Sequence, residues 1–198
     1  MPSVVDDGSS TTLGIQHWAR RGIVGRGVLL DVARHQDAGG VPLDPTRRFD
    51  ITATLLDEVA GAQGVVIERG DVLLIRTGWT GWYQRQDAST RAAEFTAEAG
   101  QPGLAPTEET AEWLWDRHVS AVAADNMAVE PAPLDMTEGN FLHLRLIPGF
   151  GMPIGEFFWL DDLAAACATD NRWSFMFTSA PLNVPGGVGS PPNALAIR

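Results

Sequence analysis

The sequence has few basic residues, a single cysteine and no long hydrophobic run, and each shortage excludes a class of function. Fourteen Lys and Arg residues stand against 25 Asp and Glu residues, giving a formal net charge of −11. Because binding to a nucleic-acid backbone needs clustered basic side chains, this balance argues against DNA or RNA as a partner. No stretch approaches the roughly 20 apolar residues of a membrane helix. Residues 1–12 also lack the basic and apolar regions of a signal peptide.

The single cysteine, Cys167, excludes an internal disulfide framework and fits the reducing cytoplasm. It lies among alanines, which is typical of a small buried side chain. The remaining composition, 44% hydrophobic and 20% charged over 198 residues, is that of a globular domain with its own core. We therefore expect a cytoplasmic protein that neither enters a membrane nor binds nucleic acid.

Short apolar runs alternate with stretches of helical spacing along the chain, and these patterns predict strands and helices respectively. Strands are expected at residues 28–32, 72–75, 119–124, 152–158, 173–179 and 194–197. Helices are expected at residues 51–62, 107–118 and 160–168, with a helix or turn at 141–147 and a loop at 35–48. The alternation predicts an α/β fold, and the strand-rich last third favours a mixed sheet. Residues 1–12 are expected to form a loose lead-in, and residues 13–198 a single domain.

His143 and Glu156 form the strongest candidate site. Each lies in an otherwise apolar segment, and burying a carboxylate there is costly unless a metal or a cation compensates it. An imidazole and a carboxylate brought together are natural ligands for Zn²⁺ or Mn²⁺. The alternatives are a buried hydrogen bond between the two side chains, or an ion pair of Glu156 with an arginine.

Two further groups could line a substrate pocket. Asp125 and Asn126 close an apolar strand, where α/β proteins tend to place binding groups. The alternative is a solvated acidic loop that begins with a turn at Asp125-Asn126 and continues through Glu130, Asp135 and Glu138. Trp79 and Trp82 follow another strand through glycines. Their rings could bind a flat substrate, form a subunit interface or simply fill the core.

Other motifs are excluded or uninformative. The Gly-rich stretch 185–193 has no lysine, and two prolines block a following helix, so it predicts turns and no phosphate loop. No Gly-x-Ser-x-Gly elbow is present. The remaining histidines, His17, His35 and His118, lack metal-ligand spacing and are interpreted as surface or interface residues.

Several segments, taken in order, resemble the cyclase family of metal-dependent hydrolases, which includes kynurenine formamidases and isatin hydrolases. They are residues 25–32 (GRGVLLDV), 70–79 (GDVLLIRTGW), 102–104 with the helix that follows, 124–130 (ADNMAVE), 143–156 and 180–194. The resemblance runs from about Leu13 to Arg198. It implies a swivelling β/β/α fold and hydrolysis of a non-peptide C–N bond in an aryl formamide or a cyclic amide. Through the kynurenine formamidases, it implies a role in tryptophan catabolism.

The resemblance also implies a divalent metal, Zn²⁺ or Mn²⁺. It makes His143 a metal ligand or general base, and Glu156 a metal ligand or the partner of one. In the family, an upstream motif of the form His-x-Gly-Thr-x-x-Asp-x-x-x-His supplies most of the ligands, and residues 1–12 contain no such pattern. We therefore expect a domain incomplete at its N-terminus, with weak or no metal binding and compromised activity.

The leading hypothesis is thus an arylformamidase- or cyclase-like hydrolase of a small molecule. One alternative is a non-catalytic homologue that binds a small molecule. Another is a structural domain whose tryptophans, seven in all, lie in an oligomer interface. Under each hypothesis we expect a homo-oligomer, because an incomplete domain leaves apolar surface to be covered.

Overall fold

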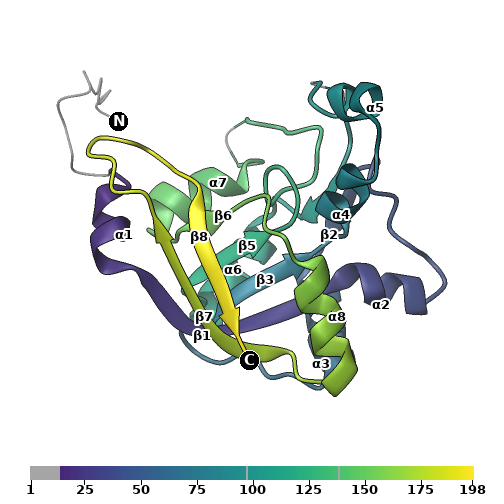
Figure 1. The fold of residues 1–198 in the computed structure, drawn as a ribbon, viewed down its shortest axis with the longest axis horizontal. Coiled ribbons are helices and arrows are strands. Elements are labelled where there is room, and N and C mark those ends of the chain that lie inside the picture. Colours follow the sequence, from purple (N-terminus) through teal and green to yellow (C-terminus); the bar gives the residue numbers. More distant parts are fainter. Residues whose placement is uncertain (1–13, 97, 138) are drawn as a thin grey trace. The chain divides into compact units, whose positions relative to one another are not determined.

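The computed structural model describes residues 14–96, 98–137 and 139–198 (Figure 1). These residues form two compact units. The larger unit is Gly27–Ser174, and the smaller one combines the chain up to Arg26 with Phe175–Arg198. The predicted lead-in, residues 1–12, lies outside the described residues. Among those described, no helix combines the length and apolar character needed to cross a bilayer.

Four parallel strands make up the sheet of the larger unit. Their order is β6-β5-β3-β1, and the register places Leu29 of β1 beside Leu74 of β3, which lies beside Ala123 of β5. The strands are β1 (Ile23–Asp31, whose first residues belong to the smaller unit), β3 (Val72–Arg76), β5 (Ala121–Ala124) and β6 (Ile154–Gly155). Strands covered on both faces are expected to be continuously apolar, as these runs are.

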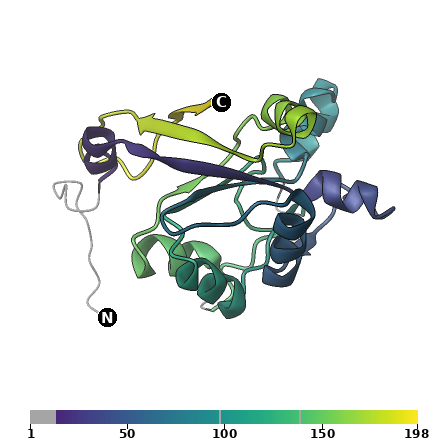
Figure 2. The same cartoon turned by 90° about the horizontal axis from the view of Figure 1, so that it is seen from below.

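Helices cover both faces of this sheet. Figure 2 shows α3 (Ala53–Gln63) and α6 (Glu108–Asp116) on one face and α8 (Asp161–Asp170) on the other. Thr52 caps α3 by accepting a hydrogen bond from Leu55 N, and Thr107 caps α6 in the same way. The three helices predicted from the sequence are confirmed, with boundaries shifted by a few residues.

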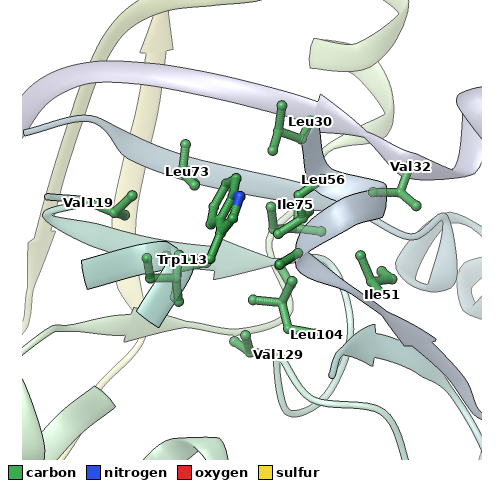
Figure 3. Close-up of a cluster of buried hydrophobic side chains, with 14 of the residues drawn as sticks. Leu30, Val32, Ile51, Leu56, Leu73, Ile75, Leu104, Trp113, Val119 and Val129 are labelled. Carbon is green, nitrogen blue, oxygen red and sulfur yellow. The ribbon is translucent and has the colours of Figure 1, made fainter. Parts of the chain in front are cut away.

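The core of the larger unit lies between the sheet and the helices α3 and α6 (Figure 3). Leu30, Leu73 and Ile75 point into it from the strands, and Leu56 and Trp113 meet them from the helices. Leu29 and Leu74 alternate to the opposite face of the sheet and are buried there as well. Burial on both faces fixes the strand register.

Several elements were not predicted from the sequence. They are a second small parallel sheet of β2 (Phe49–Ile51) and β4 (Pro102–Leu104), and the helices α2 (Val32–Ala38), α4 (Trp79–Gln84) and α5 (Ala88–Ala93). The loop expected at 35–48 is wrong for its first residues, because Asp31 accepts a hydrogen bond from Arg34 N and starts α2. In α4, Gly81 lies so close to Asp161 of α8 that an added Cβ would overlap its carboxylate.

The smaller unit contains α1 (Gln16–Arg21) and an antiparallel pair, β7 (Ser174–Pro181) and β8 (Pro192–Ile197). The loop between these strands contacts the start of α1, because Ile15 N donates to Gly187 O at 2.7 Å. Gly186 has a φ of 77°, so the Gly-rich stretch forms a turn as predicted. Parallel strands in one unit and antiparallel strands in the other confirm a mixed α/β fold with short flanking helices.

Candidate active site

His143 lies in a single helical turn, α7 (Leu142–Leu144), which continues as a π-helical turn over Arg145–Gly149. Phe141 precedes the helix and supplies no side-chain cap. Glu130, from a separate loop, caps the helix instead, since its Oε1 accepts a hydrogen bond from the backbone N–H of His143 at 2.9 Å. A helix or turn at this position was predicted, but its cap was not.

Both ring nitrogens of His143 meet a carboxylate. Nδ1 lies 2.6 Å from Glu130 Oε1, and Nε2 lies 3.1 Å from Glu156 Oε1. The Phe141 ring stacks on the imidazole with the two centroids 4.6 Å apart. The exposed fraction of the side chain rises from 3% at Glu130 to 20% at His143 and 33% at Glu156. The three groups thus form a line from the interior to the surface. His143 and Glu156 lie within hydrogen-bond distance, which fits both the metal-pair interpretation and its hydrogen-bond alternative.

The charges around His143 decide its protonation. Burial alone would lower the pKa of the imidazole, but hydrogen bonds and negative charge from Glu130 and Glu156 outweigh it and raise the pKa of His143 to about 9. Without any other ligand the ring is therefore a cation at neutral pH, held between two acids. A metal at Nε2 would have to displace that proton.

Glu156 is positioned by the segment that follows β6. Phe157 adopts a φ of 56°, and its backbone N–H donates to Asn126 O at 2.9 Å. The N–H of Phe158 donates to Ala124 O at 3.1 Å. The strand expected over residues 152–158 is therefore wrong except at Ile154–Gly155, because the chain turns at Phe157 and attaches to the end of β5.

Asp125 and Asn126 directly follow β5 and are fully buried. Asp125 Oδ1 accepts from Thr77 N and Oγ1, both at 2.7 Å, and its Oδ2 accepts from Gly78 N at 2.8 Å. Burial raises the pKa of Asp125 to about 6, against the opposing effect of these hydrogen bonds. Asn126 Nδ2 donates to the carbonyl of Glu130 at 3.2 Å. Both side chains thus hold backbone in place, and their predicted part in a substrate pocket stays a prediction.

The predicted aromatic residues belong to one cluster beside this site. Trp79 is 1% exposed, stacks on Tyr83 at a centroid distance of 4.9 Å, and meets Trp82 at 6.3 Å. Its edge contact with Phe157, at 5.9 Å, connects the cluster to the residue next to Glu156. Trp82 is half-buried, so it can contact a ligand more readily than Trp79 can.

The residues present fit only part of a metal site. His143 Nε2 and the Glu156 carboxylate face each other and are suitable donors, whereas Glu130 lies on the Nδ1 side of the ring. Across residues 14–96, 98–137 and 139–198, no group of three or more His, Cys, Asp or Glu side chains could hold a metal ion. The described residues therefore supply two donors.

Glu130 is the site residue that sequence reasoning placed only in an acidic loop. A signal was available, because Glu130 lies between Val129 and Pro131 in an otherwise apolar stretch. An acid in such a setting is expected to have a buried partner. The sequence did not identify that partner, which lies 13 residues away.

Comparison with known proteins decides the family. The Cyclase family model matches residues 7–131, more than half of the chain. The chain belongs to the Cyclase family. Among proteins with curated descriptions, none matches it.

Solved structures of this fold extend the comparison. One, described as a novel cyclase, is 35% identical with a TM-score of 0.79, over 94% of this chain and 57% of that one. Isatin hydrolase A from Ralstonia solanacearum is 20% identical with a TM-score of 0.69, over 93% and 64%. A protein described as a predicted metal-dependent hydrolase from Bacillus stearothermophilus is 22% identical with a TM-score of 0.56, over 88% and 63%. The last two show the shared fold, and this cyclase-family chain spans less than two thirds of each structure's length.

Proposed function

We propose that this cyclase-family chain contributes proton-transfer and metal-binding residues to the hydrolysis of a non-peptide C–N bond. The observation that carries the proposal is the 3.1 Å contact between His143 Nε2 and Glu156 Oε1, with the buried carboxylate of Glu130 beside the other ring nitrogen. The name of one similar structure, isatin hydrolase, supports a cyclic amide as the substrate. An aryl formamide is proposed on the sequence resemblance to the kynurenine formamidases.

His143 would act at Nε2. Glu130 accepts a hydrogen bond from Nδ1, so Nε2 is the nitrogen that exchanges protons with the reacting atoms. The imidazolium can give its Nε2 proton to the leaving amine, and only after losing that proton can Nε2 take one from attacking water. Glu156 faces the same nitrogen and is the more exposed of the two acids, so it is the one that a substrate or an ion can reach. A group that moves protons must lie within hydrogen-bond reach of the reacting atoms. Nε2 and Glu156 lie at the exposed end of the three groups, where a substrate can reach them.

A divalent metal, Zn²⁺ or Mn²⁺, would be held in part by His143 Nε2 and Glu156. When bound, it would lower the pKa of a water ligand and polarise the substrate carbonyl. Catalytic sites need about three protein ligands and an open position. The described residues supply two, and the sequence of residues 1–12 contains no family ligand motif, so we expect weak metal binding and negligible hydrolysis by residues 1–198 alone.

The aromatic cluster would favour a flat substrate. Trp82 is half-buried and Phe157 is 48% exposed, and Trp79 lies between them as a fixed support. An aromatic pair in contact gains on the order of 1 kcal/mol beyond the burial of its surface. We propose Trp82 and Phe157 as the surfaces that a substrate ring contacts.

Hydrolysis assays with aryl formamides and isatin, in the presence of Zn²⁺ or Mn²⁺, test the proposal. They need two proteins: residues 1–198, and a form that also carries the upstream family motif. We expect activity in the second, with a roughly 10²- to 10⁴-fold lower kcat in His143→Ala. The control His35→Ala, in the middle of α2, should leave activity unchanged. Strong metal-dependent turnover by the 198-residue chain, or an extended enzyme indifferent to His143→Ala, would contradict the proposal. Ligand binding without turnover in both forms would instead identify a non-catalytic binding protein.

A further inference from the structure

We infer that Glu130 is the positioning residue of the site, and that it holds His143 so that Nε2 faces Glu156. Its meaning for catalysis rests on the proposed function, but the geometry stands by itself. Glu130 contacts Nδ1 of the ring and Glu156 contacts Nε2, so Glu130 acts on the Nε2 side through His143.

One oxygen of Glu130 makes two contacts with His143. Glu130 Oε1 accepts from the backbone N–H of His143 at 2.9 Å and from ring Nδ1 at 2.6 Å. The backbone contact fixes the start of α7, and the ring contact fixes the rotation of the imidazole about its side-chain bonds. Capping a helix needs only the first contact. The second therefore has a separate effect, which is to set the direction of the ring.

Glu130 also influences which ring nitrogen keeps its proton. An ionised carboxylate only accepts hydrogen bonds, so the imidazolium donates from Nδ1 to Glu130 and from Nε2 to Glu156. The contact to Glu130 is the shorter and the more buried of the two, 2.6 Å against 3.1 Å, so the proton on Nε2 is the one that leaves first. A carboxylate behind a histidine selects the tautomer in the same way at many metal and catalytic sites.

Neighbouring segments hold the backbone of Glu130 in place. Its backbone carbonyl accepts from Gln101 Nε2 at 3.0 Å and from Asn126 Nδ2 at 3.2 Å. Gly103 of β4 packs directly against this backbone, and a Cβ added there would overlap the carbonyl group of Glu130. The adjoining pair, Leu104 N to Val129 O at 2.8 Å, keeps the two segments side by side. The location of Glu130 thus depends on a glycine at position 103.

The test uses the 198-residue chain and the ¹H–¹⁵N resonance of the His143 Nδ1 proton. A short, charge-assisted hydrogen bond on a mostly buried ring slows exchange with solvent, so we expect a resolved downfield signal in the wild type. Glu130→Ala should abolish it. Glu130→Gln should keep it at reduced downfield shift, because the amide oxygen can still accept from both donors of His143. Glu112→Gln, an exposed acid on α6, serves as the control and should change nothing.

A second pair of variants tests the glycine. Gly103→Ala should weaken or remove the signal by displacing Glu130, whereas Gly61→Ala, in α3 with open space around it, should not. If Gly103→Ala fails to fold, the Glu130 variants still decide the inference. A Nδ1 signal that survives Glu130→Ala, or that the wild type lacks, overturns it.

Turnover is measured separately in the extended form. There Glu130→Gln should lower kcat and leave KM nearly unchanged, because a positioning residue does not touch the bound substrate. If the Nδ1 signal depends on Glu130 but the extended form shows no hydrolysis, the proposed function is wrong and the inference on Glu130 holds. If the extended form hydrolyses substrate but the signal does not depend on Glu130, the inference is wrong and the proposed function holds.

Discussion

Arg76 Nη1 lies 2.8 Å from Asp31 Oδ1 and joins the carboxyl ends of two neighbouring parallel strands. The two residues are register partners in β3 and β1. The Asp31 side chain is 1% exposed, so ion pairs with Arg76 and Arg34 replace its contacts with water. Arg76 also reaches Asp161 Oδ1 at 2.8 Å, which attaches α8 to the same end of the sheet.

Replacing Arg76 by Met should destabilise the protein strongly. It leaves the buried carboxylate of Asp31 with only its contact to Arg34, and removing one partner of a buried pair typically costs about 3–5 kcal/mol. The matched control is Arg47→Met, since Arg47 and Asp44 form an exposed pair worth about 1 kcal/mol or less. Urea unfolding of both variants measures the difference, and equal losses would contradict the prediction.

The free energy of unfolding should fall as the pH rises from about 6.5 to about 9. The folded state raises the pKa of His143, so the stabilisation is complete below the unfolded pKa of 6.5 and is lost through about 9. At about 1.4 kcal/mol per pKa unit, the loss is on the order of 3 kcal/mol at most. Urea titrations with a chelator present measure it. His143→Gln should flatten the slope and His35→Ala should not, and a slope unaffected by His143→Gln would refute the assignment.

Replacing Thr77 by Val should destabilise the protein more at pH 8 than at pH 5. Thr77 Oγ1 donates to the buried carboxylate of Asp125 at 2.7 Å, and hydrogen bonds to a charged group contribute about 1.5–3 kcal/mol. The pKa of Asp125 is raised to about 6, so the carboxylate is largely neutral at pH 5 and needs the donor less. Thr169→Val, an exposed hydroxyl on α8, is the control. A loss independent of pH would show that Thr77 acts by packing alone.

We propose a homo-oligomer held by the apolar surface where α6 meets the π-helical turn. Trp115 is 57% exposed there and packs on Phe150, and Leu144 and Ile147 nearby are 51% and 46% exposed. Exposed apolar patches of this kind mark interaction sites. Trp115→Glu should shift the mass measured by light scattering toward the monomer. Val41→Glu, at another exposed position, should not, and a monomeric wild type would rule out the assembly.

The sequence predicted the parts of this molecule whose structure follows from local pattern. The apolar runs that became β3 and β5, and the capped helix α6, have the spacing and cap residues that specify them. The sheet of β2 and β4 could not be predicted, since each strand has three residues and their pairing joins Phe49 to Pro102. Strands this short carry no readable period.

Two of the three residues of the candidate site could be predicted from the sequence, because their signal is also local. His143 and Glu156 attract notice as polar residues in apolar surroundings, and the structure brings them together. Glu130 reaches His143 only because Gly103 admits its backbone, and such a close approach between distant segments leaves no pattern in either one. Asp125 attracted notice for the same local reason, yet its carboxylate is occupied by Thr77 and Gly78.

The close packing of Gly81 on Asp161 restricts how this protein can diverge. A side chain at position 81 would meet the carboxylate of Asp161, and moving that carboxylate aside would disturb its ion pair with Arg76. Substitutions at positions 81 and 161 are therefore expected to be coupled, so that a larger residue at 81 costs less stability when residue 161 is shortened at the same time.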